Sequence, residues 1–519
     1  MKPNQKHTMD KSRRSLLKVL FSRTMIIASL LILNFALVFS FVFDLIQGLP
    51  VLFGSLVAFT AVMELIILNG RDDPSVKLTW CILVAVLPLF GSAMYFFVRF
   101  DLGNRVNRRL VAASMEASLS CLPEDETLYQ KIRTEDREFH NLSRYLQHCA
   151  HAPVYTNTAV TYFPLGEDKF DALLQALEQA EHFIYLEYFL ISRGYMWNTI
   201  LEILERKAAE GLDVRLLYDG MNAFYNLPYS YPRELEKKGI RCKMHAPVRP
   251  FVSTHYNNRD HRKIAVIDGH TAFTGGINLE DCYINRGSPY GHWKDTAVML
   301  RGDAARSFTL MFLQMWNANE RQRDFSPCRH IPEPEKAQGY VIPYGISPTG
   351  SHRVGKAVYL HMINSAKDSV YIMTPYLILD SEMVNALRFA AGRGVDVRLI
   401  LPGIPDKKSA FTLAKSHYRE LAEAGVRIYE YTPGFVHAKV FLCDDAHAVV
   451  GTVNLDYRSL YHHFECAAYL YQVPALRDIR ADFRDTMKLC REITMADIRN
   501  LSPATRIAGA LLKIVAPLM

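Results

Sequence analysis

The stretch Gly211-Leu-Asp-Val-Arg-Leu-Leu217 returns later in the chain as Gly394-Val-Asp-Val-Arg-Leu-Ile400. The preceding residues repeat as well, since the apolar run at 180–191 is echoed at 366–378. Both repeats are offset by about 185 residues, the length of a domain and not of a short structural repeat. The sequence therefore indicates one ancient duplication, which gave the chain two related halves.

Each half alternates strand-like and helix-like segments. Residues 173–180 and 201–209 space their apolar side chains three and four apart, as helices do, whereas 214–218 has the pattern of a strand. The order strand, helix, strand, helix, strand is typical of the α/β class. We expect each half to form a mixed sheet flanked by helices, with the two halves related by a pseudo-twofold axis.

Changes of composition set the expected domain boundaries. A Pro-containing stretch at 325–344 fits a linker between the halves. We therefore expect a first domain at 151–335 and a second domain at 336–500. The segment 99–150 is expected to connect the first domain to the N-terminal region. The apolar tail at 501–519 is equally compatible with lying on a membrane surface and with packing on the core.

Apolar residues gather before residue 100. Over the whole chain, apolar residues make up 50% of the 519 residues, which is at the upper end of globular usage. Three apolar runs, at about 24–43, 45–68 and 78–98, each have about the length that crosses a hydrocarbon core. A basic tail at 1–23 precedes them, but the first run is too long for a signal peptide and no cleavage site stands out. We expect three transmembrane helices in a multi-pass protein of the cell membrane.

The positive charges around these runs disagree about orientation. The positive-inside rule places the basic tail in the cytoplasm, so that three spans would put the large domains outside. The arginines that follow the third run favour the inside instead; they are Arg99, Arg105, Arg108 and Arg109. A re-entrant or interfacial segment would remove the conflict. The sequence leaves the face of the large domains open.

Net charge and cysteine content exclude only some classes of protein. The formal net charge of +7 fits phosphate, anionic lipid or the charges that orient a membrane protein, and it does not choose between lipid and nucleic acid. The 9 cysteines are scattered and form no C-x-x-C pair or zinc spacing. We therefore expect neither a disulfide framework nor a structural zinc site. No glycine-rich nucleotide-binding loop is present.

Each half carries the same constellation of polar residues. The first half reads His261-Arg-Lys-Ile-Ala-Val-Ile-Asp268 and then Gly275-Gly-Ile-Asn278. The second half reads His437-Ala-Lys-Val-Phe-Leu-Cys-Asp444 and then Gly451-Thr-Val-Asn454. The spacings of His, Lys, Asp, Gly and Asn are identical in the two copies. Five fixed positions do not recur twice by chance in a chain of this length, so we interpret the pair as functional.

These residue types suit a phosphodiester. Side chains two apart on a strand point to one face, so His261 projects with Lys263, and His437 with Lys439. If the halves meet about the pseudo-twofold axis, the two imidazoles lie on opposite sides of a phosphorus atom and the two ammonium groups lie at its oxygens. One neutral histidine would attack phosphorus while the other, protonated, donates to the leaving oxygen. The pair would then share one proton.

The remaining motif residues are further candidates. Asn278 and Asn454 offer neutral hydrogen-bond donors for the phosphate. Asp268 and Asp444 are catalytic candidates by their place in the motif. Each follows its lysine by an odd number of residues, however, and so points away from the His and Lys face. We therefore interpret both aspartates as braces at the end of a strand.

Two other acidic residues are candidates to orient the imidazoles, although each taken alone is equally compatible with an ordinary surface acid. Asp295 and Glu465 each follow the histidine of their own half by about thirty residues, in a later strand, where a carboxylate can fix the tautomer and stabilise an imidazolium. The pair His462-His463 has no further metal ligands at a useful spacing, so no metal site is predicted.

Together these motifs resemble the phospholipase D superfamily, and the sequence around them is similar to that of bacterial cardiolipin synthases. The resemblance covers the chain from about residue 77 to its end. The stretches that carry it are Asn258–Ile264, Gly275–Asn278, Trp293–Thr296, Thr374–Tyr376, Tyr429–Phe435 and Gly451–Ser459. The run at 24–43 departs from the family, which usually has two N-terminal spans.

The resemblance implies two phospholipase D-like domains that condense two phosphatidylglycerol molecules into cardiolipin and release glycerol. It implies a phosphatidyl intermediate on His261 with His437 as acid and base, although the pseudo-symmetry leaves these roles interchangeable. It implies no metal, nucleotide or other cofactor, and a membrane lipid rather than a nucleic acid as partner. Two alternatives share the motifs: a phospholipase D hydrolase, and a phosphodiester nuclease, against which the apolar N-terminal runs count.

Overall fold

The computed structural model describes residues 32, 49–70, 72–100, 102–122, 125–247, 257–329, 335–350 and 352–518. The chain forms two compact units, one up to Val106 and the other comprising nearly all of the chain from Asn107. The basic tail at 1–23 lies outside the described residues, and only Ile32 is described within the expected span at 24–43.

The described part of the first unit is helical. Its helices are α3 (Leu49–Leu68), α4 (Pro74–Val86) and α5 (Pro88–Phe100). Residues 78–98, where one span is expected, fall in two helices that meet at Leu87. Pro88 has no N–H group to continue the helix and keeps the preceding residue out of the helical conformation. Among the helices of the described part, none combines the length and the apolar character needed to cross a membrane.

In the second unit, the first half of the chain forms a seven-stranded sheet in the order β1-β8-β6-β5-β2-β3-β4. Its strands are β1 (Thr158–Phe163), β2 (Phe183–Tyr188), β3 (Asp213–Asp219), β4 (Arg241–His245), β5 (Lys263–Ile267), β6 (Thr271–Gly275) and β8 (Ala297–Gly302). Its helices are α9 (Gly166–Glu178), α10 (Tyr195–Ala209), α11 (Asn222–Tyr225), α12 (Tyr231–Glu236) and α13 (Ala305–Trp316). Strands β2, β3 and β4 are parallel and β5 is antiparallel to β2, so the sheet is mixed, as expected.

The second half forms an eight-stranded sheet in the order β17-β12-β11-β10-β14-β15-β16-β9. Its strands are β9 (Tyr340–Ile346), β10 (Ser369–Met373), β11 (Asp396–Pro402), β12 (Arg427–Tyr431), β14 (Val440–Cys443), β15 (His447–Gly451), β16 (Glu465–Tyr471) and β17 (Cys490–Glu492). Its helices are α14 (Val354–Ser365), α15 (Ser381–Gly392), α16 (Lys408–Ala422), α17 (Leu476–Lys488), α18 (Met495–Arg499) and α19 (Pro503–Val515). The order β14-β10-β11-β12 repeats β5-β2-β3-β4, so the duplication is visible in the topology.

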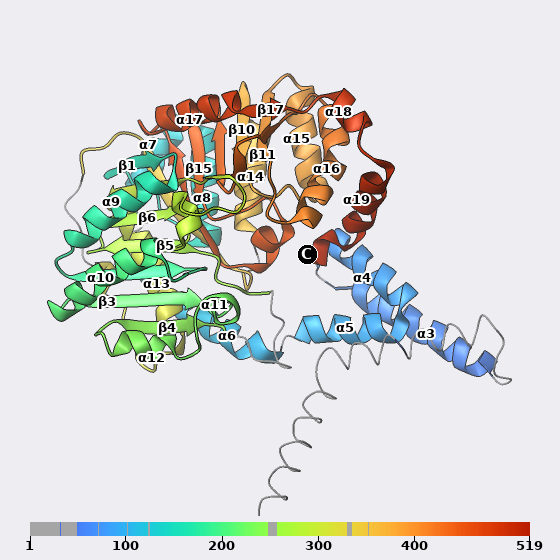
Figure 1. Cartoon of the computed structure of the whole chain (residues 1–519), viewed down its shortest axis with the longest axis horizontal. Coiled ribbons are helices and arrows are strands. Elements are labelled where there is room, and N and C mark those ends of the chain that lie inside the picture. Colours follow the sequence, from blue (N-terminus) through green and yellow to red (C-terminus); the bar gives the residue numbers. More distant parts are fainter. Residues whose placement is uncertain are drawn as a thin grey trace, which may run out of the picture. The chain divides into compact units, whose positions relative to one another are not determined.

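The two sheets pack against each other. Val266 and Leu300 of the first sheet share one buried apolar core with Val450 and Leu470 of the second. The other face of the first sheet forms a core with α9 and α10, and that of the second forms a core with α14, α15 and α16. Figure 1 shows the green strands of the first half beside the orange and red strands of the second, with helices on the outside. The alternating pattern of each half therefore produces helix-flanked sheets.

The segment 99–150 does more than connect. It contains α6 (Leu102–Ala117), α7 (Glu126–Glu135) and α8 (Arg137–Ala150). Phe139 of α8 stacks on Tyr471 of β16 with 4.1 Å between ring centroids, and the Tyr471 hydroxyl donates to Asp136 at 2.7 Å. Helices α7 and α8 are therefore part of the core of the second half, which their position in the sequence did not predict.

Within the apolar tail at 501–519, helix α19 packs on the protein through one face. Gly509 of α19 faces α16, where an added Cβ would lie 3.0 Å from Ser416. Ile507 and Leu511, on the other side of the helix, are exposed. One face of α19 thus packs on the protein and another is open.

Candidate active site

The two motifs are placed where the halves exchange backbone hydrogen bonds. His261 lies just before β5, and its N–H donates to the carbonyl of Phe464, a residue of the second half, at 2.9 Å. His437 lies just before β14, and its N–H donates to the carbonyl of Lys294, a residue of the first half, at 2.7 Å. The short strands β7 (His292–Lys294) and β13 (Gly434–Val436) pair in parallel across the same boundary. Each motif is therefore fixed by the backbone of the other half.

The acidic partners of the histidines are crossed in the same way. Nδ1 of His261 lies 2.9 Å from both carboxylate oxygens of Glu465, and Nδ1 of His437 lies 2.7 Å from Oδ2 of Asp295. The sequence identified both acids, but the expectation that each serves the histidine of its own half is wrong. Glu465 is the first residue of β16 and Asp295 directly follows β7, and the pseudo-twofold axis brings each of them to the opposite histidine. The site is complete only with both halves.

The carboxylates determine the tautomer of both imidazoles. A carboxylate accepts, so Nδ1 of each ring carries the hydrogen and Nε2 keeps its lone pair for chemistry. Burial lowers the pKa of His261 to about 3, against the opposing effect of Glu465. Burial and the nearby Lys439 lower the pKa of His437 to about 4. With these pKa values both rings are neutral near pH 7, and a bound phosphodiester anion would favour protonation.

Two buried ammonium groups lie beside the histidines. Nζ of Lys263 donates to the carbonyl of His261 at 2.6 Å, and Lys439 donates to the carbonyl of His437. Their exposed fractions are 2% and 1%. Burial lowers the pKa of Lys263 to about 8 and that of Lys439 to about 7. Because charge buried in a low dielectric is costly without a counter-ion, an anion is the natural complement of this pair.

A glycine and a threonine at equivalent positions contact the two carboxylates. A Cβ on Gly276 would lie 2.0 Å from Oδ1 of Asp295, so only glycine leaves that carboxylate its place. The corresponding residue of the second half is Thr452, whose hydroxyl donates to Glu465. The role of neither residue was predicted from the sequence. A comparison of the two copies at this position, where they differ, was the signal available.

The two motif asparagines have unequal environments. Oδ1 of Asn278 accepts from the N–H of Leu190 at 3.1 Å, and Nδ2 donates to the Tyr283 hydroxyl at 2.6 Å. Oδ1 of Asn454 is buried and has no partner within the described residues. Asn278 therefore braces the first half, whereas Asn454 keeps hydrogen-bonding capacity for a ligand.

The motif aspartates lie away from this constellation. Asp268 accepts from the N–H groups of residues 181–183, and Asp444 accepts from those of residues 367–369. Both have a positive φ, 53° and 50°, in the turns that follow β5 and β14. Their inclusion among the catalytic candidates is therefore corrected: they hold strand ends together, as their odd spacing indicates.

Aromatic rings surround His437. Tyr283 and Trp293 each lie 5.4 Å from its ring, and Phe435 lies 5.8 Å away. The ring of His261 instead has Phe189 at 5.0 Å and His463 at 5.7 Å. Sequence reasoning named none of these rings as part of the site. Their closeness gives the two histidines different apolar surroundings in spite of the pseudo-symmetry.

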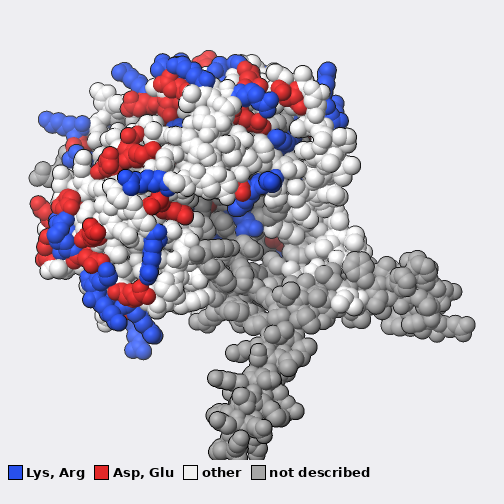
Figure 2. Space-filling model, viewed as in Figure 1, with Lys and Arg blue, Asp and Glu red and all other residues white. Residues whose placement is uncertain are grey.

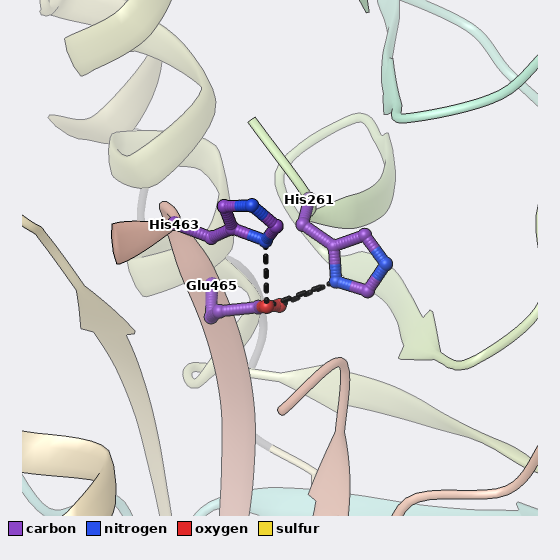
Figure 3. A group of neighbouring side chains, drawn as sticks. All are labelled: His261, His463 and Glu465. Atoms are coloured by element: carbon purple, nitrogen blue, oxygen red, sulfur yellow. Dashed lines mark hydrogen bonds and ion pairs between the residues drawn. The ribbon is translucent and has the colours of Figure 1, made fainter. Parts of the chain in front are cut away.

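A cluster of possible metal ligands overlaps the site. Figure 3 shows His261 and His463 both directed at the carboxylate of Glu465, and the ligand atoms of the three residues lie within 4.8 Å of one another. Two imidazoles and a carboxylate can hold zinc. Glu465 nevertheless accepts from Nδ1 of His261, and a metal on that nitrogen would displace the proton that fixes the tautomer. Sequence reasoning missed this cluster because it spans both halves.

Charge on the surface is mixed. Figure 2 shows Lys and Arg interspersed with Asp and Glu over the face in view, without a continuous basic stripe. Proteins that bind nucleic acid usually concentrate Lys and Arg along one face. This distribution gives no support to a nuclease.

Two imidazoles with free Nε2 atoms, two ammonium groups and two orienting carboxylates can carry out in-line exchange at a phosphodiester. The fold and the site define a two-motif enzyme of the phospholipase D type. Residues 173–316 and 359–487 match the family model described as cardiolipin synthase, PLD-like domain, and residues 56–99 match the one described as phospholipase D-nuclease N-terminal. The chain belongs to the cardiolipin synthases of the phospholipase D superfamily, and it is a phospholipid phosphatidyltransferase.

Similar proteins agree with that assignment. The chain is 33% identical to a cardiolipin synthase of Alkalihalophilus pseudofirmus, over 88% of this chain and 91% of that one. It is 50% identical to an uncharacterized protein of Streptococcus mutans, over 88% of this chain and 99% of that one. Its fold is similar to that of a phosphatidylserine synthase of Haemophilus influenzae, with a TM-score of 0.56, 16% identity, and coverage of 73% of this chain and 97% of that one.

Proposed function

We propose that this cardiolipin synthase joins two phosphatidylglycerol molecules and releases glycerol through a covalent phosphatidyl intermediate on His261. The observation that carries the proposal is the crossed pairing of His261 with Glu465 and of His437 with Asp295. Each pairing leaves an Nε2 atom for chemistry, and two such atoms are what a double displacement at one phosphorus requires.

In the first step Nε2 of His261 attacks the phosphorus of the donor lipid. The P–N bond forms, and the bond from phosphorus to the oxygen of the headgroup glycerol breaks. His437, protonated when the anionic donor is bound, gives its Nε2 proton to that oxygen, and glycerol departs. Glu465 stabilises the positive charge that develops on the His261 ring.

In the second step the acceptor phosphatidylglycerol enters where glycerol left. A hydroxyl of its glycerol headgroup attacks phosphorus, and the now neutral His437 removes the proton. The bond between phosphorus and Nε2 of His261 breaks, which restores both histidines. One phosphodiester replaces another, so the cycle needs no nucleotide.

Lys263 and Lys439 supply fixed positive charge in both steps. Their ammonium groups are buried beside the two imidazoles, where a positive charge stabilises the oxygens of a pentavalent transition state more strongly than it would in water. We propose Nδ2 of Asn454 as a neutral donor to the same oxygens, and no metal or other cofactor.

We further propose that the protein is a multi-pass protein of the cell membrane, held there by the apolar runs before residue 99. The catalytic halves are proposed at 151–335 and 336–500. The lipid substrate supports membrane attachment, because both phosphatidylglycerol molecules must be taken from a bilayer.

The test is to give purified protein phosphatidylglycerol vesicles in the presence of a metal chelator, and to identify the products by mass spectrometry. Cardiolipin and glycerol in equal amounts are the expected result. A His261→Ala preparation is the matched control. Phosphatidic acid as the dominant product would replace the transferase proposal with a hydrolase. Activity that disappears with the chelator and returns with one metal would contradict the cofactor-free mechanism.

A further inference from the structure

Helices α4 and α5 fold back on each other. The rings of Trp80 in α4 and Tyr95 in α5 lie 5.5 Å apart, edge to face. In one continuous helix, residues this far apart in sequence would be separated by about 22 Å. The side chain of Arg99, at the end of α5, binds Asp72, just before α4, at 2.7 Å. The two ends of the segment are therefore neighbours, and Leu87 and Pro88 form its tip.

Close packing of the two arms depends on small residues. A Cβ on Gly91 would lie 2.7 Å from the carbonyl oxygen of Leu83 and 2.9 Å from the Cα of Val84. Ser92, the next residue, is also buried. Helices pack this closely inside membranes, where small side chains let two backbones approach.

Polar and apolar groups are segregated along this hairpin. Its open end carries the Asp72–Arg99 ion pair, together with Lys77, whose Nζ donates to the carbonyl of Leu68 at the end of α3 at 2.9 Å. Between Lys77 and Arg99 the sequence contains no charged residue. A turn in water normally carries polar residues, whereas this tip reads Val86-Leu-Pro-Leu-Phe90.

Two backbone N–H groups of the tip are hydrogen-bonded within the hairpin. The N–H of Leu87 donates to Leu83 at 2.9 Å, that of Gly91 donates to Leu87 at 2.6 Å, and Pro88 has no N–H. A backbone in hydrocarbon must satisfy its own polar groups in this way. Leu78 and Val86 expose 61% and 63% of their surface, which in water would be unfavourable.

We propose that residues 74–100 form a re-entrant hairpin that enters and leaves the bilayer through one face, with its apolar tip in the hydrocarbon. Each arm has 13 residues and is about 20 Å long, so the tip passes the middle of a hydrocarbon core of about 30 Å without reaching the other side. The inference rests on the proposed membrane attachment and adds its topology. A hairpin in place of the third expected span removes one crossing of the membrane. The basic residues of the N-terminal tail and those after α5 would then face the same side of the membrane.

Sidedness distinguishes this hairpin from a span. Asn69→Cys lies before the hairpin and Val106→Cys lies after it, at a side chain that is 65% exposed. Each full-length variant is placed in sealed vesicles of right-side-out and inverted orientation and treated with a charged, membrane-impermeant maleimide. Mass spectrometry of the peptides then separates the engineered cysteine from the native ones. Cardiolipin formation by the same vesicles checks that each variant is folded.

Both engineered cysteines are expected to react from one face and to lose labelling from the other. Reaction of the two sites from opposite faces would establish a span and overturn the hairpin. A third variant, Leu87→Cys at the tip, should resist the same reagent from either face, and its labelling would place the tip in water, which also overturns the hairpin. Cardiolipin formation reports separately on the proposed reaction. If a variant is inactive, Leu68→Cys and Leu119→Cys, at two other exposed positions, replace the pair.

Discussion

Glu465, in the second half of the chain, accepts a hydrogen bond from Nδ1 of His261, in the first half, and both carboxylate oxygens lie 2.9 Å from that nitrogen. Asp295 of the first half holds His437 of the second half in return, at 2.7 Å. Loss of such an acid should affect the reaction step carried out by the histidine of the other half, and not the step carried out by the histidine of its own half. This separation makes the pairing testable by kinetics.

We expect Glu465→Gln and Asp295→Asn each to lower kcat for cardiolipin formation by about 10- to 100-fold or more, because outer partners orient the reacting groups. A phosphodiester with a p-nitrophenol leaving group needs little protonation. It should therefore restore the first step in Asp295→Asn, where His437 is misplaced, and not in Glu465→Gln, where the attacking His261 is misplaced. Burst kinetics of p-nitrophenol release measure this step.

The control is Glu423→Gln, a change at a solvent-exposed ion pair with Arg419, which should leave both substrates unaffected. Rescue of Glu465→Gln with no rescue of Asp295→Asn would mean that each acid serves its own half, against the crossed arrangement.

The same leaving group assigns the nucleophile. In His437→Ala, His261 should still attack, release one equivalent of p-nitrophenol and then stall, because no base activates the acceptor hydroxyl. His261→Ala should give no burst and no adduct. Peptide mapping of the trapped protein locates the phosphatidyl group. A modified His437 beside an unmodified His261 would reverse the two roles.

Gly276→Ala should impair turnover strongly, because its Cβ would lie 2.0 Å from the Asp295 carboxylate that holds His437. Gly392→Ala, where a Cβ meets nothing within 4 Å, is the matched change at an open position and should retain full activity. Melting temperatures of both variants show whether the loss is in the site or in the fold. Normal kcat in Gly276→Ala would show that Asp295 does not need its present position.

The buried lysines predict the basic limb of the pH profile. Burial lowers the pKa of Lys439 to about 7 and that of Lys263 to about 8. As pH rises through these values the lysines lose the charge that stabilises the transition state, so kcat/KM should fall. A bound phosphodiester anion favours the charged lysines, so kcat should fall only at higher pH. Initial rates from pH 6 to pH 10 test this, and a kcat/KM that stays level across this range would contradict the lowered pKa values of the two lysines.

The sequence predicted the features that depend on local geometry. His261 and Lys263 project together because strand side chains alternate, and the odd spacing of Asp268 correctly turned it away from them. The crossed acids could not be derived, because spacing along the chain does not say which strand end meets a histidine across a twofold axis. The Leu87-Pro88 pair could have predicted the break at Leu87. The run was instead interpreted from its length and apolar character. Helices α7 and α8 carry no chemical motif, so only packing reveals that they belong to the second half.

The exchanged contacts have a consequence for how such a chain could arise. A single copy of this fold has a histidine with no carboxylate and a carboxylate with no histidine, so a one-motif ancestor could work only as a homodimer. In that dimer every substitution would have appeared twice, once at each active centre. Fusion into one polypeptide ended this constraint, and the copies could then diverge. Gly276 opposite Thr452, and Asp295 opposite Glu465, are positions at which they have done so, giving a symmetric dimer's active centre two specialised sides.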